Sequence, residues 1–231
     1  MLAIFGKINT AWLDCKLKQN MARSSYLLVP KRIFDGILEQ EKWLLPRSIK
    51  PVLVVESDFD VMWKHVQCIM KDSPPSQIYL LDCYEEFLFS GLTGTVLRPK
   101  HWNKFELVEN FMTRANQQYV NFDTHFPDSK CRLVICPVLP VNILRVNNRN
   151  EPIEEDMAEQ AMLDDVVETI NGRLIQLNDR LGLNTPRIDR ELLWIRQNTG
   201  NDGLTPDGDG LELENSVFER INRCLTVTTQ D

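Results

Sequence analysis

Short apolar runs separated by longer segments with helical spacing dominate the chain. The runs Val52–Val55, Ile78–Leu81 and Arg132–Val138 have the length and continuity of buried strands. Between them, Phe59–Met70 and His101–Tyr119 place apolar residues at helical intervals. Continuous apolar strands that alternate with helices are typical of a parallel sheet covered on both faces. The pattern therefore predicts a three-layer α/β/α fold around a central, mostly parallel sheet.

The longest helical pattern runs over Ile153–Leu181. Carboxylates crowd its start, where they favour the helix dipole, and Gly182 stands where a C-terminal cap belongs. Beyond it we expect a short fourth strand over Ile188–Ile195 and a final helix over Leu211–Leu225. The polar residues Thr226–Asp231 are expected to form a flexible tail.

The first fifty residues differ in charge from the rest. They carry nine Lys and Arg against four acids, whereas the other residues bring the chain to a net charge of -7. After a poorly patterned start, Pro30 opens a predicted helix that ends before Pro46. We expect residues 1–50 to be a basic segment docked on a domain of residues 51–225. Its charge suits either an acidic partner such as nucleic acid or docking on an acidic body.

Composition excludes several classes of protein. With 231 residues, 43% hydrophobic and 26% charged, the chain is an ordinary folded protein. Its apolar runs fall short of the roughly 20 residues of a membrane span, and Met1–Phe5 is too short for a secretory signal core. The six cysteines lack C-x-x-C spacing, and the acids of residues 198–210 lack the alternation of a calcium loop. We expect a cytoplasmic protein with reduced thiols and no metal or cofactor.

Ligands of open parallel sheets bind in the loops after the strands. Three such loops, together with the order of elements and the pairs Ile170-Asn171 and Leu177-Asn178 of the long helix, resemble the SGNH (GDSL-type) hydrolases over roughly residues 50–225. The family also has a flavodoxin-like strand topology. The three loops are Val55–Asp60, Cys136–Asn142 and Asn198–Gly210.

The resemblance implies a serine nucleophile in the first turn and an aspartate and a histidine in a last D-x-x-H-P loop. On this alignment Ser57 takes the nucleophile position, although Asp58 remains an alternative, and Asp202 takes the aspartate position. Thr205 stands where the family has its histidine. Threonine cannot accept the serine proton near neutral pH.

The family's G-x-N-D turn corresponds here to Leu81–Glu85, in which a carboxylate would oppose a developing oxyanion. The resemblance therefore implies the fold without the chemistry, that is, a pseudo-hydrolase. Capping of the following helix also accounts for Ser57 and Asp58. An active esterase or lipase that pairs Ser57 with His101 or His125 is the alternative.

Members of this fold that lost the triad, such as the Oskar C-terminal domain family, imply RNA binding and assembly of ribonucleoprotein granules. Basic residues beside aromatic ones suit phosphate contact and base stacking. A pure protein scaffold is the third reading, and it fits the net charge best. We expect RNA or protein partners and no membrane. The candidate nucleic-acid residues are Arg98, Lys100, Trp102, Arg145, Arg149, Arg187 and Arg190.

Overall fold

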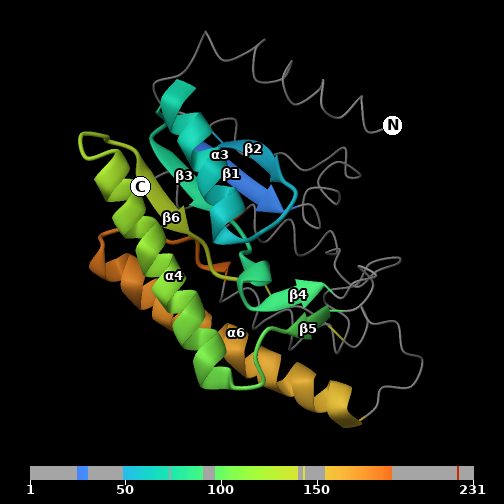
Figure 1. The fold of residues 1–231 in the computed structure, drawn as a ribbon. Helices are drawn as coiled ribbons and strands as arrows, with labels where there is room; N and C mark the ends of the chain where they lie inside the picture. The colour runs from blue at the N-terminus through green and yellow to red at the C-terminus, as the bar shows by residue number, and fades with distance from the viewer. Residues whose placement is uncertain are drawn as a thin grey trace, which may run out of the picture.

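The computed structural model describes residues 25–30, 49–72, 74–90, 97–139, 143, 154–188 and 223. Its main sheet has four strands in the order β2-β1-β3-β6, and every neighbouring pair is parallel. An antiparallel pair, β4-β5, lies beside it (Figure 1). The strands are β1 Ser25–Pro30, β2 Ile49–Val54, β3 Gln77–Leu80, β4 Leu88–Ser90, β5 Leu97–Pro99 and β6 Arg132–Ile135. The helices are α3 Phe59–Asp72, the 3-10 turn η2 Tyr84–Glu86, α4 Lys104–His125 and α6 Glu154–Arg180.

The parallel α/β class predicted from the sequence is confirmed. The strand order starts from the middle of the sheet and moves to one side and then the other, as in flavodoxin-like folds. Strand residues of both faces are buried: Leu28 and Leu80 on one face, Leu27 and Tyr79 on the other. Both faces of the sheet are therefore covered, as a parallel sheet requires.

Strand β1 is the main departure from the sequence prediction. Residues Ser25–Pro30 were expected in a segment outside the α/β domain, and that placement is wrong, because β1 pairs with both β2 and β3 inside the sheet. Pro30 is the last residue of this strand, whereas the sequence predicted it as the first residue of a helix. The remaining predictions for residues 31–48, including a helix after Pro30, lie outside the described residues, as do those for residues 189–222.

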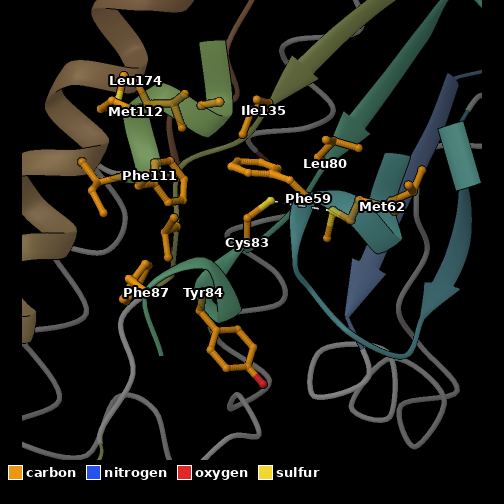
Figure 2. Close-up of a cluster of buried hydrophobic side chains, with 14 of the residues drawn as sticks. Phe59, Met62, Leu80, Cys83, Tyr84, Phe87, Phe111, Met112, Ile135 and Leu174 are labelled. Atoms are coloured by element: carbon orange, nitrogen blue, oxygen red, sulfur yellow. Dashed lines mark hydrogen bonds between the residues drawn. The ribbon is translucent and has the colours of Figure 1, made fainter. Parts of the chain in front are cut away.

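The core lies between one face of the sheet and helices α3, α4 and α6 (Figure 2). Phe59 and Met62 of α3 reach the same cluster as Phe111 of α4 and Leu174 of α6. The rings of Phe59 and Phe111 lie 5.4 Å apart at a tilt of 55°. Aromatic pairs favour such tilted contacts, and burial of these large side chains supplies most of the driving force for packing the helices on the sheet.

The helix boundaries follow from their caps. Helix α4 begins later than predicted, because Asn103 is its N-cap and accepts the Phe105 N–H at 2.9 Å. Helix α6 ends at Arg180, and Gly182 caps it as predicted, with a φ of +64° that is the left-handed value glycine favours. The Leu183 N–H donates to the Asn178 carbonyl at 2.9 Å, which completes a Schellman motif.

Two asparagines on one face of α6 hold the sheet's last described strand. Asn178 Nδ2 donates to the Ile135 carbonyl at 2.9 Å. One heptad earlier, Asn171 accepts the Val138 N–H at 2.7 Å and donates to the Val138 carbonyl at 2.9 Å. Strand β6 therefore stops at Ile135, short of the predicted Val138, because a side chain replaces the neighbouring strand as the partner of Val138.

Among the described residues, the cysteines are reduced thiols outside any disulfide: Cys83, Cys131 and Cys136 are buried, and Cys68 is exposed. Burial raises the pKa of the Cys131 thiol to about 12. No group of three metal-ligating side chains is found in this described part of the chain. None of the helices described here is both long and apolar enough to cross a bilayer.

Candidate functional site

A cavity of about 770 Å³ opens at the carboxyl ends of β2 and β3. The loop after β2, the turn after β3, the segment between β5 and α4, and the first turns of α4 surround it. This is the edge at which open parallel sheets bind ligands. Its polar lining consists of Glu56, Asp58, Asp60, Glu85, Glu86, Lys100, His101, Asn110, Thr113 and Arg114.

The loop after β2 is shaped by the start of α3. Asp58 caps this helix, since its Oδ1 accepts the N–H groups of Asp60 at 2.8 Å and of Val61 at 3.0 Å. The preceding Ser57 is fully buried. Its hydroxyl oxygen accepts the backbone N–H of Glu85 at 3.3 Å. The capping interpretation is therefore confirmed for Asp58, and Ser57 faces the turn that follows β3.

That turn is set by Asp82, which has a φ of +60°. This left-handed conformation favours glycine, asparagine and aspartate over other residues. The Asp82 side chain is fully buried, and its Oδ1 accepts the Leu139 N–H at 3.1 Å. The chain then enters η2, which brings Glu85 and Glu86 against the start of α3.

Two carboxylates occupy the backbone donors at the start of α3. The Ser57 N–H donates to Oε2 of Glu85, and the Phe59 N–H donates to Oε1 of Glu86. Helix N-termini attract anions because their N–H groups are free and the helix dipole is positive there. In this chain the protein's own carboxylates fill that place.

Arg114 of α4 fixes the second of these carboxylates. Its Nε lies 2.6 Å from Oε2 of Glu86, and its Nη2 lies 3.2 Å from Oδ2 of Asp60. Burial raises the pKa of Glu86, and the Phe59 N–H and Arg114 partly offset that rise. Burial also raises the pKa of Glu85, and the nearby Glu56 adds to the rise while Ser57 opposes it.

The cavity is acidic as a whole. Five carboxylates line it against the two permanent cations Lys100 and Arg114. A negative charge that develops in such surroundings is destabilised, whereas a cation is stabilised. The arrangement can hold a positively charged group, and it is unsuited to an oxyanion.

Solved structures of other proteins share this architecture. Over 99% of this chain and 96% of the other, it is similar to a GDSL-like lipase from Bacteroides thetaiotaomicron, with a TM-score of 0.57 and 10% identity. It is likewise similar to a protein from Bacteroides fragilis described as an acylhydrolase, over 100% of this chain and 97% of the other, with a TM-score of 0.55 and 6% identity. Neither a family model nor a curated protein sequence matches the chain.

The chain has an SGNH-hydrolase-like fold. Ser57 follows β2, which is the second strand among the described residues, whereas the resemblance places the nucleophile after the first strand. The first described strand is β1, and the residues that follow it, 31–48, lie outside the described residues. The nucleophile position of Ser57 therefore stays a prediction from the sequence resemblance. Asp202 and Thr205 also lie outside the described residues.

The histidines of this SGNH-like domain are dispersed. His101 lines the cavity, and its Nδ1 lies 3.5 Å from a carboxylate oxygen of Glu106. His125 lies at the end of α4, three turns beyond Arg114. Its ring packs on Trp63, and its Nδ1 lies 2.8 Å from the Asn121 carbonyl oxygen. It borders a separate cavity of about 420 Å³. Among the described residues, no histidine contacts Ser57.

The candidate nucleic-acid residues that the structure describes are Arg98, Lys100, Trp102 and Arg187, and not all of their charges are available to a ligand. Arg98 pairs with Glu159 of α6 at 2.6 Å. Lys100 is exposed at the cavity, Trp102 is exposed beside it, and Arg187 is exposed and has an interaction partner. Arg145, Arg149 and Arg190 lie outside the described residues.

Sequence reasoning did not identify the residues that close the start of α3. Glu85 entered only as the last residue of a poor match to a G-x-N-D turn, and Glu86 was not considered. Arg114 lies three residues after Phe111 and one heptad after Leu107, a spacing that faces the core, where a cation needs a partner. The available signal was a pair of adjacent acids in the short turn after a buried strand, because such residues need partners when they turn inward.

Proposed function

We propose that this chain is a catalytically inactive SGNH-hydrolase-like domain that acts as a protein-binding module. The observation that carries the proposal is the contact of the Glu85 and Glu86 carboxylates with the N–H groups of Ser57 and Phe59. Acyl transfer needs free donors at the position where the oxyanion develops, and removal of one such donor costs about 100-fold or more in rate. Here anions already fill the donors beside the cavity.

The state of Ser57 supports the same proposal. Its hydroxyl is buried and accepts a backbone N–H, and the charged group next to it is a carboxylate. A serine needs a positioned base and an exposed oxygen in order to attack an ester. The resemblance adds Thr205 at the position of the family's histidine.

The negative charge of the cavity and of the chain favours a protein partner over RNA. The cavity lining is acidic, and the chain as a whole carries a net charge of -7. Two cations of the 98–104 segment are neutralised, since Arg98 pairs with Glu159 and Lys104 pairs with Asp165. RNA binding within a ribonucleoprotein granule is the second candidate, and the exposed Lys100 beside Trp102 is the observation that favours it.

A paired assay tests the proposal. Hydrolysis of p-nitrophenyl acetate and p-nitrophenyl butyrate is measured for the natural chain and for Ser57→Ala, and RNA binding is measured over a salt series. We expect ester hydrolysis at the background rate in both proteins and weak RNA binding. Turnover that disappears in Ser57→Ala would establish an esterase instead. Tight RNA binding that falls steeply with salt would establish a nucleic-acid module, because neutralised phosphates release counterions.

A further inference from the structure

Helix α4 lies on the outside of the fold, and over its last three turns its outer face carries few charges (Figure 1). Only one of its five exposed residues over 115–124 is charged, whereas four of the six exposed residues of α3 are. All five fall within about a third of the helix circumference, on the side opposite the buried Ala115 and Phe122. Depletion of charged residues is the compositional sign of the centre of a protein interface. The five residues, which we call the α4 face, are Asn116, Gln117, Val120, Asp123 and Thr124.

The polar side chains of the α4 face are held along their own helix. Asn116 Nδ2 donates to the Met112 carbonyl at 2.9 Å. Thr124 Oγ1 donates to the Val120 carbonyl at 2.7 Å. Val120, 57% exposed, lies between these two side chains. Because the polar groups are already ordered on the helix, contact with a partner would cost little further side-chain entropy.

We propose that the α4 face docks the same face of a second copy of the chain, with the two α4 helices antiparallel and a two-fold axis beside Val120. In a two-fold dimer one patch meets itself, so the patch has to be self-complementary. Amide and hydroxyl side chains meet this condition, because each can both donate and accept a hydrogen bond. Two copies with a net charge of -7 repel each other, and they do so least where the local charge is lowest. The proposal goes beyond the proposed function, since no residue of the α4 face lines the cavity.

The two-fold arrangement gives the one charge of the face a partner. Gln117 and Asp123 each lie three residues from Val120, so an axis beside Val120 sets Gln117 of one copy opposite Asp123 of the other. Gln117 Nε2 donates to Asn121 Oδ1 at 2.8 Å, which uses one of its two hydrogens and leaves the second for that carboxylate. The antiparallel helices also place their dipoles in the favourable, opposed orientation.

Sedimentation velocity of the full chain tests the proposal over a series of protein concentrations, at low and at physiological ionic strength. The samples are the natural chain, Val120→Asp, Val120→Lys and an equal mixture of these two variants. Ala161→Asp is the control, because it adds the same charge to an exposed position of α6. The α4 face lies beside the other end of α6, where Tyr119 contacts Asn178.

We expect a reversible dimer of the natural chain and of the control, and the dimer should tighten as salt screens the repulsion between the two copies. Val120→Asp and Val120→Lys should each weaken association by about tenfold or more, since each sets two like charges at the axis. Their mixture should dimerise again, because opposite charges then meet there, and this recovery also shows that both variants fold. A chain that stays monomeric at every concentration would overturn the proposal. Association that Val120→Asp leaves unchanged, or a mixture that stays as weakly associated as its two components, would overturn it as well.

Discussion

Glu86 and Arg114 form a forked ion pair, with Nε to Oε2 at 2.6 Å and Nη2 to Oε1 at 3.3 Å. The carboxylate side chain is 2% exposed, whereas the guanidinium side chain is 42% exposed. The pair therefore joins a buried anion of the η2 turn to a half-exposed cation of α4. Because Glu86 also accepts the Phe59 N–H, this single residue ties together α3, η2 and α4.

Arg114→Met leaves the Glu86 carboxylate buried without its cation. We expect the free energy of unfolding to fall by about 3 kcal/mol, the low end for a broken buried pair. In the double variant of Glu86→Gln with Arg114→Met, part of this loss should return, because no buried charge remains uncompensated. Urea unfolding measures both. Arg173→Met, which breaks the exposed pair with Glu109, is the control and should cost less than about 1 kcal/mol. Equal losses in the two single variants would contradict the structural role of Glu86.

Glu85→Gln tests the electrostatics of the turn through pH. Burial raises the pKa of Glu85 above its ordinary value in the folded state. The folded protein therefore binds the proton more tightly than the unfolded chain, so the contribution of this group to stability is largest below the unfolded pKa of about 4.3 and is lost as pH rises through the folded pKa. Glutamine keeps an oxygen that can accept the Ser57 N–H and carries no charge. The variant should match the natural chain near pH 4 and exceed its stability at neutral pH.

The measurement is the urea midpoint across this pH range. Glu168→Gln on the exposed face of α6 is the control, and its stability should follow that of the natural chain at every pH. A Glu85→Gln curve parallel to the natural one would show that the carboxyl is not perturbed by burial.

Asp82 combines a left-handed backbone with a buried hydrogen bond to Leu139. Asp82→Asn retains an acceptor oxygen and tolerates the positive φ, so it should cost less than about 1 kcal/mol. Asp82→Ala loses the acceptor for a buried N–H and the short polar side chain that makes a positive φ tolerable, which should cost about 3 kcal/mol in total. Thermal unfolding compares the two. Equal costs would mean that neither feature contributes.

The elements with strong local signals could be predicted from the sequence. Strand β3 is a continuous apolar run and α6 has seven turns of regular spacing, so periodicity alone identifies them. Strand β1 has an apolar run of the same length, Tyr26–Val29, bounded by Ser25 and Pro30. It was missed because Pro30 suggested a helix start.

The candidate site was only partly predictable for a different reason. The cavity's position follows from the parallel sheet, and Asp58 is recognisable as a cap from its type and place. The contacts that define the site join Ser57 to Glu85 and Phe59 to Glu86, 28 and 27 residues apart. Such pairs depend on the register of β2 and β3 against β1, which no local pattern specifies.

Tyr119 and Asn178 form the buried link between α4, α6 and the end of the sheet. The Tyr119 hydroxyl donates to Asn178 Oδ1 at 2.5 Å and accepts the Ile135 N–H at 3.0 Å. Asn178 Nδ2 closes the ring by donating to the Ile135 carbonyl at 2.9 Å. Both polar groups of Ile135, at the end of β6, thus have side-chain partners.

Tyr119→Phe leaves the buried Ile135 N–H without its acceptor and should lower the free energy of unfolding by about 2 kcal/mol. Asn178→Ala also opens a small cavity and should lower it by about 3 kcal/mol. Because the two side chains share one network, the double variant should cost less than the sum of the two. Urea unfolding of the four proteins measures this coupling. Asn116→Ala on the exposed side of α4 is the matched control, and its change should stay within about 0.5 kcal/mol. The energy of a shared hydrogen-bonded ring is lost once and not twice, so strict additivity of the two costs would contradict the shared ring. It would mean that Tyr119 and Asn178 stabilise β6 independently.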